Sequence, residues 1–79
     1  MRGVLAENLK KLRNLRGLSQ ESLADLAGID RTYVSLLERR RYAATVDVIE
    51  NLARALNVEP EQLLRIDVSA DIDESPPSR

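Results

Sequence analysis

The sequence contains no cysteine and no histidine among its 79 residues. Disulfides, thiolate chemistry and the ordinary zinc ligands are therefore excluded, which is typical of a reducing cytosol. Apolar residues never run long enough to cross a bilayer, and the N-terminus lacks the apolar stretch of a signal peptide. The only aromatic residues are Tyr33 and Tyr42, too few for a platform on which single strands would stack. We expect one small cytoplasmic domain.

The sequence also lacks the usual groupings of catalytic residues. No Gly-rich loop that could cradle a phosphate occurs, and the carboxylates are scattered rather than paired. We therefore expect no enzyme activity, no metal site and no cofactor.

Charge is divided unevenly along the chain although the net charge is only −1. Residues 1–41 contain nine Lys or Arg and five Asp or Glu, whereas residues 42–79 contain three and eight. A basic half and an acidic half indicate one surface for a polyanion and another for a different partner. A mixed, solvated surface would be the alternative interpretation.

Helix signals divide the sequence into five short segments, and no stretch alternates apolar and polar residues as a strand would. The first segment covers roughly 4–16 and stops at Gly17, while Gly28 and Asn57 suit the ends of later helices. The residues that favour the starts of the other four helices are Ser19, Asp30, Thr45 and Pro60. We predict an all-α domain over residues 1–68 and a disordered acidic tail over residues 69–79.

Two of the predicted helices lie close together in residues 20–38, separated only by a few residues around Gly28. This length and turn chemistry favour a helix-turn-helix. On the second of these helices Val34 and Leu37 are expected to point inward. The outward positions carry residues whose side chains suit the edges of DNA bases, namely Arg31, Thr32, Ser35 and Leu36.

The segment "LKKLRNLRGLSQESLADLAGIDRTYVSLLERRR" resembles the Xre/Cro type of lambda-repressor-like DNA-binding domain. The matching elements are Gln20, Leu23-Ala24, Gly28-Ile29, Val34-Ser35 and Glu38, followed by "VIENLARALNVEPEQLL". The resemblance covers about residues 5–66 and implies a five-helix fold. Within the family, "LAENLKKLR" and "RTYVSLLER" are most similar to restriction–modification controller proteins.

The resemblance implies roles for individual residues. The helix that carries Arg31, Thr32, Ser35 and Leu36 is similar to the recognition helix that lies in the major groove. Arg13 and Glu38 match a buried ion pair, which we assign to structure. The residues expected near the DNA backbone are Gln20, Tyr33, Arg39, Arg40 and Arg41. For Tyr33, packing at the edge of the core is an equal alternative, and Leu36 could equally cover the joint between helices.

Two positions depart from the family pattern. Arg40 stands where the family often has Gly, and a non-Gly residue is strained in a left-handed helix end, so this helix could end differently or run on. Ala43-Ala44 replaces the usual Asn-Pro turn. Both changes leave the path of residues 39–45 open.

The last predicted helix is more apolar than one small core requires. Leu63, Leu64, Ile66 and Val68 therefore indicate a homodimer interface, although they could simply close the core of the monomer. The expected function is a dimeric, sequence-specific regulator of transcription bound to double-stranded DNA. The alternative is an antitoxin or adaptor that holds a protein partner, and RNA polymerase or a toxin would be a further partner.

Overall fold

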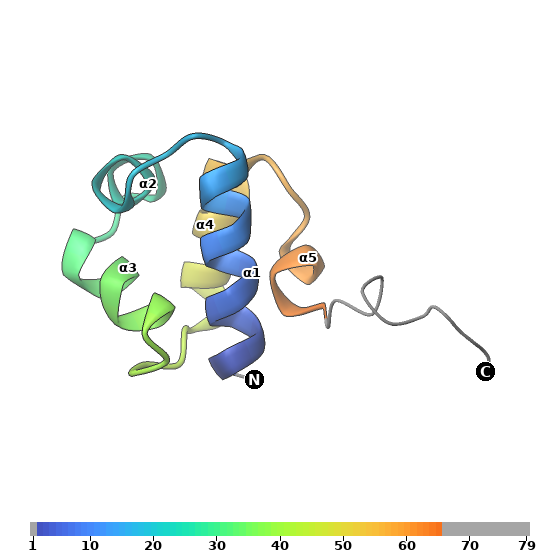
Figure 1. The fold of residues 1–79 in the computed structure, drawn as a ribbon. Helices are drawn as coiled ribbons and strands as arrows, with labels where there is room; N and C mark the ends of the chain where they lie inside the picture. The colour runs from blue at the N-terminus through green and yellow to red at the C-terminus, as the bar shows by residue number, and fades with distance from the viewer. Residues whose placement is uncertain (1, 66–79) are drawn as a thin grey trace.

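The computed structural model describes residues 2–65, which form five helices and no strand. In Figure 1, α1 runs through the middle of the molecule, α2 and α3 lie on one side of it, α5 lies on the other, and α4 lies behind it. The helices are α1 (Arg2–Leu15), α2 (Gln20–Ala27), α3 (Arg31–Glu38), α4 (Val46–Leu56) and α5 (Pro60–Leu64). The predicted all-α, five-helix fold is confirmed. The first helix begins two residues earlier than the sequence suggested and ends one residue sooner.

The caps predicted from the sequence hold the starts of three helices. Ser19 Oγ accepts a hydrogen bond from the N–H of Ser22 at 3.0 Å. Asp30 Oδ1 accepts from the N–H of Thr32 at 2.7 Å. Thr45 caps α4 through its hydroxyl in the same way. Each cap satisfies an N–H that has no partner inside its helix, so the capping residue determines where each of these helices begins.

The end of α3 is an unexpected feature of the backbone. Arg40 has φ +63°, so it adopts the left-handed conformation that glycine usually supplies. Its N–H donates to the carbonyl of Leu37 at 3.1 Å, and the N–H of Arg41 donates to that of Leu36 at 2.9 Å. These two bonds form a Schellman motif. The helix therefore ends at Glu38 and does not run on.

One apolar core joins all five helices. Its largest fully buried side chains are Leu9, Leu23, Val34, Leu37, Leu52, Leu56 and Leu63. The small residues Ala24, Ala27 and Ala53 are also buried, which lets neighbouring helices approach closely. Burying a Leu or Val side chain contributes roughly 1.5–3 kcal/mol, so these residues supply most of the favourable free energy of folding.

The side chains of Asn8 on α1 and of Arg16, directly after α1, hold the ends of α5 and α4. Arg16 Nε donates to the carbonyl of Leu56 at 2.8 Å, at the last turn of α4. Asn8 Nδ2 donates to the carbonyls of Leu63 and Arg65 at 2.9 and 2.7 Å. These bonds satisfy carbonyls that a helix end leaves without a partner.

Candidate nucleic-acid interface

The helix-turn-helix is closed by a left-handed glycine. Gly28 has φ +72°, and its N–H donates to the carbonyl of Asp25 at 3.3 Å. The N–H of Ile29 donates to the carbonyl of Ala24 at 3.0 Å. Because the buried methyl groups of Ala24 and Ala27 occupy little space, α2 and α3 pack directly on either side of this turn.

One side of α3 is buried in the core, and the opposite side carries polar and charged residues. Val34 and Leu37 are completely or almost completely buried, as predicted. Arg31 and Thr32 are exposed, whereas Ser35 and Leu36 are half-buried. The polar groups of Arg31 and Thr32 therefore lie at the surface, whereas Leu36 is partly covered by the rest of the protein.

An ion pair fixes the other end of α3. Arg13 Nε lies 2.6 Å from Glu38 Oε2, and Arg13 Nη2 donates to Glu38 Oε1 at 3.0 Å. The side chains are only 12% and 3% exposed. Arg13 Nη1 also donates to the carbonyl of Leu18, at 2.8 Å, so α1 holds both α3 and the segment that leads into α2. This geometry assigns the pair to structure.

Gln20 joins the same network, which the sequence did not predict. Its Nε2 donates to Glu38 Oε1 at 3.0 Å, and the residue is half-buried. A side-chain amide has two N–H groups, so one hydrogen remains for another acceptor. The bond to Glu38 thus orients the amide at the first turn of α2, beside the N–H groups of that helix.

Tyr33 lies at the edge of the core, with its ring against Tyr42. The ring centroids are 5.9 Å apart and the planes are inclined by 75°, an edge-to-face contact. Tyr33 is half-buried and packs against the core, whereas Tyr42 is largely exposed. The packing role considered for Tyr33 is therefore present in the structure, and it joins α3 to the loop before α4.

The three arginines after α3 are all exposed but differ in their surroundings. Arg40 Nη2 forms an ion pair with Glu7 Oε2 at 3.1 Å, and both side chains are more than half exposed. Its guanidinium passes over Gly3, where an added Cβ would lie 3.7 Å from it. Arg40 therefore folds back onto α1. The sequence had suggested that Arg39, Arg40 and Arg41 would together lie near the DNA backbone.

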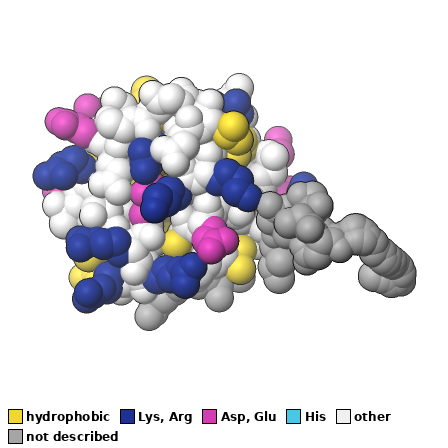
Figure 2. Space-filling model, in the orientation of Figure 1, with side chains coloured by type: hydrophobic (Ala, Val, Ile, Leu, Met, Phe, Trp, Pro, Cys, Tyr) yellow, Lys and Arg dark blue, Asp and Glu magenta, His cyan; other side chains and the backbone are white. Residues whose placement is uncertain are grey.

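Lys and Arg side chains are spread over the face formed by α1 and α3 (Figure 2). A hollow of about 380 Å³ lies on α1, next to the end of α3. Its lining includes Lys10, Lys11, Asn14 and Arg40. Lys10 and Asn14 were not predicted from the sequence, because their proximity to Arg40 depends on how α1 packs against α3.

The predicted dimer residues fall into three groups. Leu63 has an exposed fraction of 0% and belongs to the core, so its assignment to an interface was wrong: the side chain has no surface to offer a second chain. Leu64 is half-buried and packs against the core. Ile66 and Val68 lie outside the described residues, as does the predicted tail.

The all-helical fold, with a glycine turn between α2 and an α3 whose polar residues face outward, defines a helix-turn-helix DNA-binding domain. Comparison with known families gives the same class, since the helix-turn-helix family (HTH_3) matches residues 9–63. The chain belongs to this family, whose members are DNA-binding regulators of transcription. The resemblance to Xre/Cro regulators is confirmed.

Individual relatives refine this assignment. The chain is 48% identical over 64 residues to a hypothetical transcription factor of Neisseria meningitidis serogroup B, covering 81% of this chain and 60% of that protein. It is 43% identical over 61 residues to the control protein C.SmaI of Serratia marcescens, covering 77% and 73%. The chain thus spans less than two thirds of the length of the first relative and more than two thirds of the length of the second.

Solved structures show the same fold. The crystal structure of the restriction–modification controller protein C.AhdI from Aeromonas hydrophila superposes with a TM-score of 0.76 at 42% identity, covering 78% of this chain and 94% of that one. The Neisseria transcription factor superposes with a TM-score of 0.83 at 45% identity, covering 87% and 79%. Among residues 2–65, no helix combines the length and apolar character needed to span a membrane.

Proposed function

We propose that this chain is a sequence-specific regulator of transcription that binds an inverted-repeat operator as a homodimer, with α3 in the major groove. The observation that carries the proposal is the division of α3 into a buried side, Val34 and Leu37, and an exposed side that begins with Arg31 and Thr32. Arginine pairs with guanine O6 and N7, and threonine and serine hydroxyls pair with several bases. In this proposal Arg31, Thr32 and Ser35 read base edges, with Leu36 against a thymine methyl group.

Contacts to the DNA backbone would orient α3. Gln20 is aimed by its bond to Glu38 and stands at the first turn of α2, where backbone N–H groups favour a phosphate. Arg39 and Arg41 are exposed directly after α3 and would add electrostatic affinity, with Arg40 reaching a phosphate by leaving Glu7. The hydroxyl of Tyr33 is a further donor at the edge of this surface.

Pairing of two chains would provide the sequence specificity that a single helix-turn-helix lacks. One helix-turn-helix reads only a few base pairs, too few to single out a site among the roughly 10⁶ competing sites of a genome. Two copies related by a two-fold axis would read half-sites about one helical turn apart. We place the interface on α4 and α5, with half-buried Leu64 and the following Ile66 and Val68 as its apolar residues.

The names of two relatives favour a particular biological role. C.AhdI is named a restriction–modification controller protein and C.SmaI a control protein, and we propose the role of a restriction–modification controller for this chain. Activation of transcription would need a surface for RNA polymerase, and the exposed Glu21 and Asp25 on α2 offer one.

The second candidate function is an antitoxin, because the acidic second half could hold a toxin. The neighbouring gene discriminates: a methyltransferase or endonuclease favours the controller, and a small toxin favours the antitoxin.

Selection of bound duplexes from a random DNA pool tests the proposal directly. An enriched inverted repeat with half-sites about 10 bp apart is expected. Absence of enrichment, with only weak and salt-sensitive binding, would favour the protein-partner function instead. Sedimentation in parallel tests the pairing, since a monomer at high micromolar concentration would rule out the dimer.

A further inference from the structure

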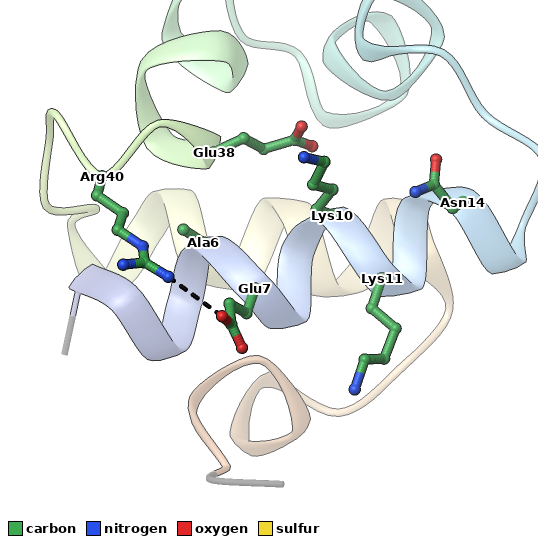
Figure 3. A pocket seen from close by; sticks show the side chains of 7 residues that line it. All are labelled: Ala6, Glu7, Lys10, Lys11, Asn14, Glu38 and Arg40. Atoms are coloured by element: carbon green, nitrogen blue, oxygen red, sulfur yellow. Dashed lines mark hydrogen bonds and ion pairs between the residues drawn. The ribbon is translucent and has the colours of Figure 1, made fainter.

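The hollow on α1 carries more positive charge than its acidic neighbours balance. Glu7 is paired with Arg40, and Glu38 is held by Arg13 and Gln20. Lys10 also lines this hollow, so Lys10, Arg13 and Arg40 face two carboxylates and the local charge is positive. Figure 3 shows Lys10 pointing toward Glu38, while Lys11 extends toward the side on which α5 lies.

A second, smaller hollow leads from the end of α5 to the first. It has a volume of about 200 Å³ and is lined by Asn8, Lys11, Leu12, Gln62 and Arg65. Lys11 lines both hollows, which therefore adjoin along α1. The carbonyl of Arg65 is held against α1 by Asn8 at 2.7 Å, so the described part of the chain ends at this second hollow.

The chain that starts there is acidic. Residues 66–79 contain Asp67, Asp71, Asp73 and Glu74 and a single base, Arg79. An extended chain spans roughly 3.3 Å per residue, so a segment of this length reaches about 46 Å, far enough to follow both hollows. The negative charge of segment 66–79, its attachment to Arg65 beside the second hollow and its length therefore all suit it as the occupant of the two hollows.

We propose that the two hollows dock the acidic segment 66–79 of the same chain, and that this segment competes with DNA for the basic surface. Carboxylates of the segment would lie near Lys10 and Arg40, and Arg40 is also one of the arginines assigned to the DNA backbone. The docking itself is independent of the proposed function, whereas the competition rests on it. The result is an internal counter-anion that weakens nonspecific DNA binding more than operator binding, because nonspecific binding depends on phosphate contacts alone.

Substitutions in the full chain test the competition. The first variant neutralises the segment with Asp67→Asn, Asp71→Asn, Asp73→Asn and Glu74→Gln. A matched control neutralises four exposed carboxylates elsewhere with Asp25→Asn, Asp47→Asn, Glu50→Gln and Glu61→Gln. Both variants change the net charge equally, so a difference in DNA affinity between them reports the effect of the position of the charge.

Affinity for a random duplex at about 0.1 M salt, where screening extends over roughly 10 Å, is the first readout. We expect the neutralised segment to raise this affinity about three- to tenfold and the control to raise it less. In a Lys10→Gln background the gain should shrink. An equal gain in the control variant, or a gain unaffected by Lys10→Gln, would overturn docking in the hollow.

A second readout does not involve DNA. Because the chain has no cysteine, Ser75→Cys provides a single site for a spin label. We expect the label to broaden the amide signals of Lys10 and Asn14, and this broadening to disappear with the neutralised segment and at about 1 M salt, where screening shortens to roughly 3 Å. Broadening that survives both changes, or none at all, would contradict the docking. Broadening without any DNA binding would leave the docking intact and refute the proposed function.

Discussion

The two ends of α3 differ in how firmly the protein holds them. At the C-terminal end, Glu38 accepts hydrogen bonds from Arg13 and Gln20, and the backbone closes in a Schellman motif. At the N-terminal end, one cap from Asp30 precedes exposed Arg31 and Thr32. The helix is thus anchored most firmly at Glu38, which has no proposed base contact, and is held least at Arg31 and Thr32, which are proposed to read bases.

The largest expected effect comes from breaking the anchored end. Arg13→Ala leaves Glu38 buried without its cation, and such a loss costs roughly 3–5 kcal/mol of unfolding free energy. Urea denaturation followed by circular dichroism measures it. Arg54→Ala, an exposed arginine on α4, is the control and should unfold near the wild-type urea concentration. An Arg13→Ala variant as stable as that control would show that the ion pair contributes little.

A substitution at the N-terminal end of α3 should change the affinity for DNA rather than the stability of the fold. Arg31→Ala is expected to cost about 1–3 kcal/mol of operator affinity if Arg31 pairs with a base, and to leave the urea midpoint unchanged. Titration of the selected operator and of a random duplex measures both affinity and specificity. Equal losses on the two duplexes would reassign Arg31 to the DNA backbone.

The cap of Asp30 is the main local support of the open end. Asp30→Ala removes the acceptor for the N–H of Thr32, and loss of such a cap costs about 1 kcal/mol. For a domain of this size that corresponds to roughly 4–8 °C in melting temperature. Asp30→Asn retains a capping oxygen and should melt near the wild type. Identical losses in both variants would point to the charge rather than to the cap.

The smallest expected effect is a gain at the anchored end. A left-handed conformation costs a non-glycine residue roughly 1–2 kcal/mol, while the exposed pair with Glu7 contributes about 0–1 kcal/mol. Arg40→Gly should therefore stabilise the fold by about 0.5–1 kcal/mol in urea denaturation. The neighbouring Arg39 has φ −95°, so Arg39→Gly should destabilise the fold instead. Destabilisation by Arg40→Gly would show that the contact with α1 outweighs the strain.

The features that the sequence predicted are local ones. Ser19, Asp30 and Thr45 cap helices through bonds to residues two or three positions away, so their types alone indicate where helices begin. Val34 and Leu37 follow from helical spacing in the same way. The Arg13–Glu38 pair was expected only through resemblance to a family, because nothing between residues 13 and 38 shows that they meet.

The features that were missed or wrong depend on tertiary packing. Asn8 reaches a carbonyl 55 positions away, and Arg16 reaches one 40 positions away. Leu63 was assigned to an interface because apolar residues near a chain end look alike whether they face the core or a partner. Arg40 is a different case, because local backbone bonds to the carbonyls of Leu37 and Leu36 keep it left-handed, whereas the preference for glycine at such a position had left the end of this helix open.

The separation of α3 into buried and exposed positions has a consequence for evolution. Val34 and Leu37 hold the helix, and the exposed Arg31 and Thr32 do not belong to the core. Substitutions at those two outer positions are therefore nearly neutral for folding, since surface changes usually alter stability by less than about 0.5 kcal/mol. Under the proposed function, in which Arg31 and Thr32 read bases, a lineage carrying this scaffold would exchange one DNA target for another in single mutational steps without passing through an unfolded ancestor.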